Sequence, residues 1–182
     1  MSDPDPDLDS NHDVDVTPDR SAGAHRLHHV GIACADPAPV TTLYHELFGW
    51  SIAHEERLPE RGLQVAFLGA ETPYLELVAP IGADSDTDED EDENENEDDA
   101  DADGPIERFL RRSGPGLHHL AYAVPDVAAA IERARAVGVD PVDERPRPGA
   151  WGHQVAFLRP EPAAGVLFEL IAIAAEPSTG RE

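Results

Sequence analysis

Alternating and apolar stretches predict the same order of elements twice along the chain. In the first unit the pattern predicts strands at 27–34, 50–57, 63–69 and 74–79, and a helix from Asp36 to Gly49. In the second it predicts strands at 117–124, 139–144, 153–158 and 166–173, and a helix from Asp126 to Gly138. A short amphipathic helix at 105–112 leads into the second unit. Each unit therefore has the order β-α-β-β-β.

The repetition extends to the residues themselves. The segment Leu27–Ala33 (LHHVGIA) recurs as Leu117–Ala123 (LHHLAYA), and QVAFL occurs at both 64–68 and 154–158. The segment YLELVA at 74–79 likewise corresponds to LFELIA at 167–172. We expect such a duplicated unit to pack as two pseudo-symmetric halves around a shared cleft.

The charge of the chain is concentrated in two tracts. The formal net charge is −25, of which −6 lies in residues 1–20 and −14 in residues 84–103. Such tracts bury too little apolar surface to offset the entropy lost on ordering. We therefore predict a disordered acidic tail at 1–25, a module at 26–80, a disordered acidic insert at 81–104, a second module at 105–176 and a tail at 177–182.

The bulk composition excludes several classes of protein. The chain has no lysine, and its thirteen basic residues are all arginine; with the acidity, this favours adaptation to a salt-rich cytoplasm over an acidic interaction tail. The acidity argues against a nucleic-acid partner. Cys34 is the only cysteine, so no disulfide is expected. No apolar run suits a membrane span or a signal peptide, so we expect a cytoplasmic protein.

Each first strand carries a His-His pair. Because side chains alternate between the faces of a strand, His29 shares a face with Gly31, and His119 shares one with Ala121. Small residues suit the wall of a cleft, so we predict that His29 and His119 face the cleft. By the same alternation, His28 and His118 are expected at the edge of the packed face.

Each last strand carries one glutamate among apolar residues. A buried carboxylate such as Glu76 or Glu169 needs a cation or a shifted pKa. With His29 and His119, the two glutamates would neutralise a divalent ion, and this donor set suits Co, Mn, Ni, Zn or Fe(II). Four ligands on an octahedral ion would leave two positions open for a substrate.

The other histidines lack a matched partner. We expect surface positions for His12, His25, His45 and His54, whereas His153 stays open. The twin glutamines Gln64 and Gln154 either line the cleft or cap a strand edge. A surface role and a contact with substrate phosphates are both open for Arg111, Arg112, Arg145 and Arg147.

Four stretches carry a resemblance to a known family: GLHHLA at 116–121, ERPRPGA at 144–150, VAFL at 155–158 and GVLFEL at 165–170. They resemble the vicinal oxygen chelate (glyoxalase/bleomycin resistance/dioxygenase) superfamily, and within it the methylmalonyl-CoA epimerases. The resemblance implies an α+β fold of two tandem βαβββ modules, with a curved sheet around a metal cleft. It also implies a homodimer with an acyl-CoA substrate. The implied metal ligands are His29, Glu76, His119 and Glu169.

The resemblance implies interconversion of (R)- and (S)-methylmalonyl-CoA through a metal-stabilised enolate, with Glu169 as a catalytic acid/base. Epimerisation requires two proton-transferring groups on opposite faces of the substrate. Some relatives carry a glutamate in the strand matching 63–68, where this chain has Gln64 and Val65. The second group could be Glu76, a bound water or a glutamate within 55–60.

Three other functions are compatible with parts of this pattern. A glyoxalase I-type lyase uses the same four ligands, although the length of the segment from Arg159 to Gly165 favours the epimerases. An extradiol dioxygenase needs one carboxylate, and Glu76 would be a second. A metal-free member that sequesters a drug would not need the paired His and Glu.

Overall fold

The computed structural model describes residues 26–81, 104–161 and 165–173. The predicted tails, the interior of the acidic insert and the middle of the segment from Arg159 to Gly165 lie outside the described residues. In the described part of the chain, no helix is long and apolar enough to cross a membrane.

The first module follows the predicted order. It consists of β1 (Arg26–Ala33), α1 (Pro37–Phe48), β2 (Ile52–Leu58), the short 3-10 helix η1 (Pro59–Arg61), β3 (Leu63–Leu68) and β4 (Tyr74–Pro80). The Asp36 carboxylate caps α1 by accepting a hydrogen bond from the Ala38 N–H. Gly49, with a φ of 69°, ends the helix in the left-handed conformation.

The second module differs from the prediction in one strand. It consists of α2 (Pro105–Ser113), β5 (Gly116–Ala123), α3 (Val127–Ala136), β6 (Arg147–Pro148), η2 (Ala150–Gly152), β7 (Gln154–Leu158) and β8 (Leu167–Ala172). The prediction of a strand at 139–144 is wrong. Pro141 makes an isolated bridge with Leu158, and the Asp143 carboxylate accepts the Phe157 N–H at 2.9 Å. Proline lacks a donor for a regular ladder, so this segment joins the sheet through separate bonds, such as that from the Val142 N–H to the Phe157 carbonyl at 2.8 Å.

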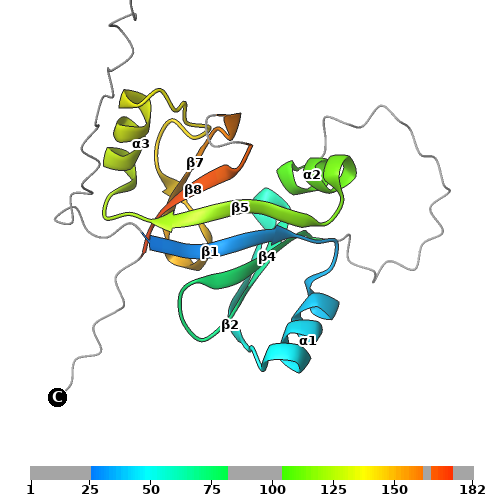
Figure 1. Cartoon of the computed structure of the whole chain (residues 1–182). Helices are drawn as coiled ribbons and strands as arrows, with labels where there is room; N and C mark the ends of the chain where they lie inside the picture. Colours follow the sequence, from blue (N-terminus) through cyan, green and yellow to red (C-terminus); the bar gives the residue numbers. More distant parts are fainter. Residues whose placement is uncertain (1–25, 82–103, 162–164, 174–182) are drawn as a thin grey trace, which may run out of the picture.

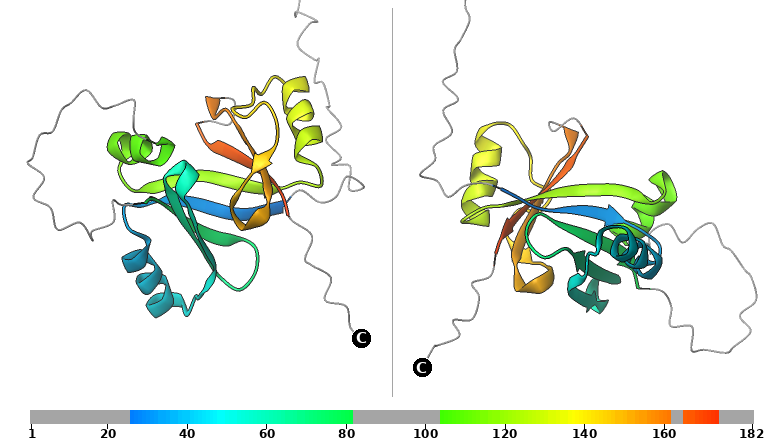
Figure 2. Two further views of the ribbon diagram at one scale, coloured as in Figure 1. Left: turned by 180° about the vertical axis from the view of Figure 1, so that it is seen from behind. Right: turned by 60° about the horizontal axis from the view of Figure 1, so that its bottom comes forward.

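All eight strands form one sheet in the order β2-β3-β4-β1-β5-β8-β7-β6. The modules meet at its centre, where β1 and β5 pair antiparallel. Outside them, β4 runs parallel to β1 and β8 runs parallel to β5. The sheet is curved, and the two halves repeat around the central pair (Figures 1 and 2).

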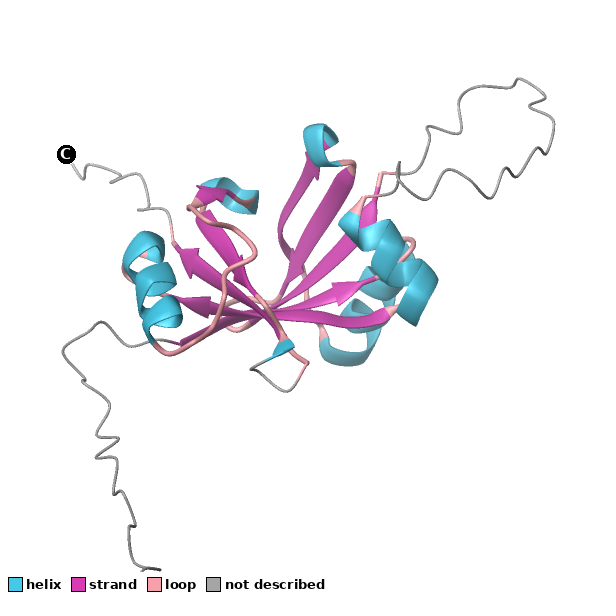
Figure 3. Cartoon of the chain, turned by 90° about the horizontal axis from the view of Figure 1, so that it is seen from above, coloured by secondary structure: helices cyan, strands magenta, loops and turns pink. Residues whose placement is uncertain are grey.

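The helices cover the sheet unequally. The apolar side of α3 packs on Ala156, Leu158 and Leu170 of β7 and β8, and α1 packs on the corresponding face of β3 and β4. α2 lies against the opposite face, where Ile106 packs with Val65 and Phe67. The view from above shows α1 and α3 outside the curved sheet (Figure 3), so the inner face is left for the predicted cleft.

Candidate metal centre

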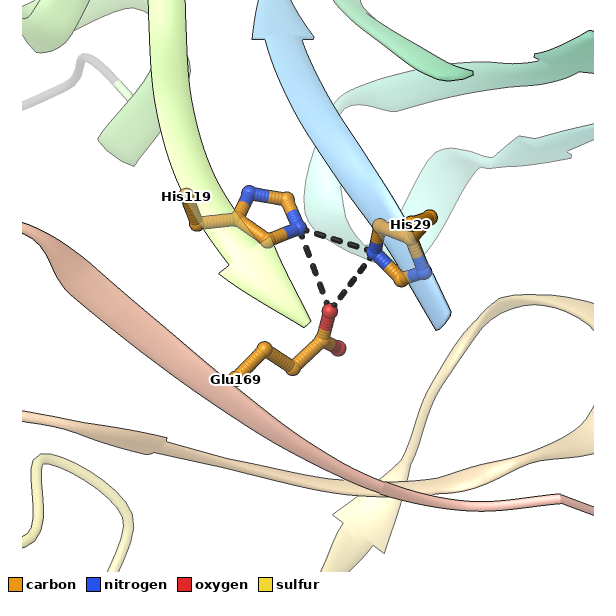
Figure 4. Close-up of side chains that lie close together, drawn as sticks. All are labelled: His29, His119 and Glu169. Carbon is orange, nitrogen blue, oxygen red and sulfur yellow. Dashed lines mark hydrogen bonds and ion pairs between the residues drawn. The ribbon is translucent and has the colours of Figure 1, made fainter. Parts of the chain in front are cut away.

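Four buried side chains meet on the inner face at the centre of the sheet. His29 and His119 come from β1 and β5, and Glu76 and Glu169 come from the flanking strands β4 and β8. The Nε2 atoms of the two histidines lie 3.0 Å apart. Glu169 Oε2 lies 3.0 Å from Nε2 of His29 and 3.1 Å from that of His119 (Figure 4). Glu76 Oε2 lies 3.4 and 3.2 Å from the same two atoms.

These spacings fit a shell around one divalent ion. Ligand atoms bonded at about 2.1 Å lie about 3.0 Å apart at a right angle and about 3.4 Å apart at a tetrahedral angle. The five distances above span 3.0–3.4 Å. In addition, His29, His119 and Glu169 each offer an atom within 4.8 Å of the others. His29, His119 and Glu169 therefore lie in a geometry that suits a metal, and Glu76 lies beside the two histidines.

A bulge in each central strand corrects the prediction for His28 and His118. The β1–β5 register shifts between Leu27 and His29, which leaves His28 outside the pairing. It shifts again between Gly31 and Ile32, which leaves His118 outside the pairing. A bulge interrupts strict alternation. His28 Nδ1 therefore lies 2.9 Å from His29 Nδ1, and His118 Nδ1 lies 3.0 Å from His119 Nδ1. Both residues therefore lie next to the cluster of His29, Glu76, His119 and Glu169, which we call the ligand cluster. They do not lie at the edge of the packed face.

The first histidine of each pair is suited to orient the second. Burial lowers the pKa of His28 and that of His118 to about 4, so both rings are neutral near pH 7. A neutral ring can accept the Nδ1–H of its neighbour, which directs Nε2 of His29 and of His119 to the centre of the cluster. Such outer hydrogen bonds fix the tautomer of metal-binding histidines.

The metal-free cluster holds protons on its imidazoles. Burial alone would lower the pKa of His119, but hydrogen bonds and charge from Glu169 and Glu76 raise it to about 10. The same carboxylates raise the pKa of His29 against the effect of burial. Burial would raise the pKa of Glu76, yet the charge of His29 and the hydrogen bond from His119 lower it to about 2. Both histidines also hold the pKa of Glu169 well below its usual range.

Gly31 makes room for the His119 ring, a role that the sequence did not show. Gly31 lies opposite His119 in the β1–β5 register. A Cβ atom at Gly31 would lie 2.1 Å from Cε1 and 2.3 Å from Nδ1 of His119. Any other residue would therefore displace this imidazole. The only sign in the sequence was that the matching position of the repeat, Ala121, is also small.

A cavity of about 530 Å³ opens over the cluster. Its wall is largely apolar and includes Val65 of β3 and Phe157 of β7. The carboxylates that line it are those of Glu76, Glu169 and Asp143. Those of residues 55, 56 and 60 lie outside its lining, as do both glutamines of the repeat. The Gln64 amide donates to the Pro80 carbonyl, so it caps a strand edge.

The other histidines divide into two groups. His45 is exposed, as predicted. The surface position predicted for His54 is wrong, because its half-buried ring stacks on Trp151 with centroids 4.8 Å apart. His153 is buried, with its ring 5.5 Å from that of His28. His12 and His25 lie outside the described residues.

Trp151 of the second module contacts Glu56 and His54 of the first. Its backbone N–H donates to Glu56 Oε2 at 2.8 Å, and the same carboxylate oxygen lies 3.2 Å from Nε2 of His54. Trp151 has a φ of 59°, which is uncommon for a residue with a side chain. The hydrogen bond to Glu56 and the stacking on His54 hold this conformation, so Glu56 has a structural partner.

Comparisons with known proteins agree with the predicted family. The model of the Glyoxalase/Bleomycin resistance protein/Dioxygenase superfamily matches residues 28–157. The uncharacterized protein YqjC of Bacillus subtilis is 32% identical, covering 80% of this chain and 90% of its own. The mitochondrial methylmalonyl-CoA epimerase of Dictyostelium discoideum is 32% identical, covering 81% and 78%.

A solved structure gives the same result for the fold. A variant of the methylmalonyl-CoA epimerase of Streptomyces coelicolor, in complex with 2-nitronate-propionyl-CoA, superimposes with a TM-score of 0.67 at 31% identity. The match covers 82% of this chain and 95% of that chain. The predicted resemblance and the predicted fold class are confirmed.

Proposed function

Because the chain belongs to the glyoxalase/bleomycin resistance protein/dioxygenase superfamily, we propose that it is a metal-dependent isomerase that interconverts (R)- and (S)-methylmalonyl-CoA. The observation that carries this proposal is the buried cluster of His29, Glu76, His119 and Glu169, of which the last three line an apolar cavity. Relatives named methylmalonyl-CoA epimerase, which cover most of the chain, support the substrate.

We propose the four clustered side chains as the metal ligands and Co, Mn, Ni or Zn as the ion. A divalent ion bound there supplies a Lewis acid for the negative charge that develops on the thioester oxygen. His28 and His118 hold the two imidazoles in place, as their Nδ1 contacts of 2.9 and 3.0 Å indicate. The apolar wall excludes water from the reacting carbon.

Two carboxylates are available to move the α-proton. We assign Glu169 to one face of the substrate and Glu76 to the other, since the two extend from strands on opposite sides of the central pair. Val65 cannot take a proton. The third carboxylate of the cavity, Asp143, is engaged by Arg147 and by the Phe157 N–H.

Metal binding is expected to release at least one proton near neutral pH. The His119 imidazole carries a proton up to about pH 10 in the metal-free cluster, and a ligand imidazole must be neutral. The apparent affinity for Co²⁺ or Zn²⁺ should therefore rise about tenfold per pH unit between pH 7 and 9. Calorimetric titrations in two buffers of different ionisation enthalpy measure the protons released, and His119→Ala is the control. Metal binding without proton release would contradict the assignment of His119.

Salt is expected to lower the KM for methylmalonyl-CoA. Pro105 and Ile106, which follow the fourteen acidic residues of 84–103 in the sequence, line the cavity. The charge of the acidic residues repels the CoA phosphates at low ionic strength and is screened in molar KCl. Initial rates measured across KCl concentrations test this. A variant with these acids replaced by serine and glutamine should lose the dependence, and an unchanged dependence would exclude the insert as its cause.

We also propose that the protein acts as a cytoplasmic homodimer in propionyl-CoA metabolism. Exposed apolar side chains on α1 support the dimer, among them Leu47 and Phe48, which are 63% and 60% exposed. Sedimentation velocity tests the oligomeric state, and a monomer at micromolar concentration would exclude it.

A glyoxalase I-type lyase is the second candidate, favoured by the presence of two carboxylates in the cluster. Its reaction also moves a proton beside a carbonyl. Turnover of the glutathione hemithioacetal, with none of methylmalonyl-CoA, would establish the lyase. Purified protein free of metal would instead favour a drug-sequestering role.

A further inference from the structure

Two arginines, one from each module, lie together on the wall of the cavity. Arg61 ends η1 in the first module, and Arg147 begins β6 in the second. The Arg61 side chain donates a hydrogen bond through Nη2 to the carbonyl of Pro148, the residue after Arg147. The two guanidinium groups thus belong to one corner of the cavity, formed where the modules meet.

Arg147 is held in a fixed orientation. Its Nε donates to Asp143 Oδ1 at 3.0 Å, and its guanidinium carbon lies 5.3 Å from the centre of the Phe157 ring. Asp143 is itself fixed by the Phe157 N–H. The bond to Asp143 uses only the Nε donor, so the Nη donors of Arg147 can serve a ligand.

This corner is close to the ligand cluster. The Phe157 ring that supports Arg147 on one side makes an edge contact with His119, with ring centroids 5.4 Å apart. One aromatic ring therefore separates the arginine from a proposed metal ligand. Arg147 and His119 line the same cavity, so one bound substrate can contact both.

The corner brings positive charge into a strongly acidic chain, whose formal net charge is −25. Arg61 and Arg147 are balanced there by Glu60, 3.9 Å from Arg61 Nε, and by Asp143. The two arginine side chains are only 27% and 36% exposed. A planar guanidinium with free donors matches carboxylate and phosphate groups.

We propose that Arg147, supported by Arg61, binds an anionic oxygen group of the thioester substrate, with Asp143 as the positioning residue. This proposal rests on the proposed function. The anion is either the carboxylate of the malonyl group or a phosphate of CoA, which have the same chemistry for a guanidinium group. Among the arginines considered for phosphate contacts, Arg145 is exposed and lies outside the lining of the cavity.

Equilibrium binding to the metal-loaded protein tests the proposal with three probes. Malonyl-CoA has both anionic groups, acetyl-CoA has only the phosphates, and malonyl-pantetheine has only the carboxylate. Arg147→Met should weaken malonyl-CoA binding roughly tenfold to a hundredfold, the loss expected for hydrogen bonds to a charged group. An equal loss with malonyl-pantetheine but none with acetyl-CoA identifies the carboxylate. The reverse pattern identifies a phosphate.

Matched variants separate binding from folding. Arg145→Met should bind all three probes like the wild type, and Arg147→Lys should recover only part of the loss because lysine lacks the fork. If Arg147→Met binds every probe like the wild type, the anion site is excluded while the proposed function stands. If the wild type itself binds no thioester, both the proposed function and the anion site are excluded.

Discussion

Replacing Glu76 and Glu169 separately with glutamine is expected to divide the reaction into its two halves. Glutamine keeps an oxygen that can bind the ion but cannot accept a proton. Each variant should lose epimerisation by roughly 10² to 10⁴-fold, the usual contribution of a general acid/base. Each should still exchange the α-proton of one epimer, and the two variants should retain opposite epimers.

Proton NMR in D₂O with each pure epimer measures this directly. Metal content is determined on the same samples, so that loss of the ion is not taken for loss of a base. Glu46→Gln, an exposed position on α1, should match the wild type. If Glu76→Gln epimerises at the wild-type rate, a water or another group serves the second face. If both metal-loaded variants lose exchange of both epimers, the assignment to opposite faces is wrong.

Gly31→Ala is expected to remove most of the activity, although it replaces no charged residue. The new Cβ would lie 2.1 Å from Cε1 and 2.7 Å from Nε2 of His119, far inside van der Waals contact. The imidazole has to move by about an ångström or more, a displacement that can cost about a hundredfold in rate. Metal affinity should fall with it, by roughly tenfold to a hundredfold.

Ala121→Gly is the matched control, because Ala121 lies opposite His29 in the same strand pair. It removes a methyl group and leaves the His29 ring free of any clash. Equilibrium dialysis with Co²⁺ and initial rates compare the two variants, with circular dichroism as the check on folding. A folded Gly31→Ala protein with wild-type metal affinity would show that the cluster tolerates a shift of His119.

The sequence predicted that these four side chains meet, because duplication left their pattern twice. Each module brings a histidine on its first strand and a buried glutamate on its last. Four strands placed side by side by the pseudo-symmetry then bring His29, Glu76, His119 and Glu169 together.

The features that the sequence did not predict depend on irregular backbone or on contacts between modules. Strict alternation placed His28 and His118 on the wrong face, because it cannot anticipate a bulge. The prediction of a strand at 139–144 failed because Pro141 lacks a donor and leaves an isolated bridge with a few separate hydrogen bonds. The stacking of His54 on Trp151 joins residues almost a hundred positions apart, which no local pattern reports.

The most direct test of the central claim is α-proton exchange of methylmalonyl-CoA in D₂O, followed by proton NMR in molar KCl. The metal-loaded wild type is compared with the metal-stripped protein and with His119→Ala, and His45→Ala serves as the exposed control. We predict rapid exchange in the metal-loaded wild type and in His45→Ala, with loss of exchange in the other two samples. Exchange that persists without metal or in His119→Ala, or none with any divalent ion in a folded protein, would contradict the account.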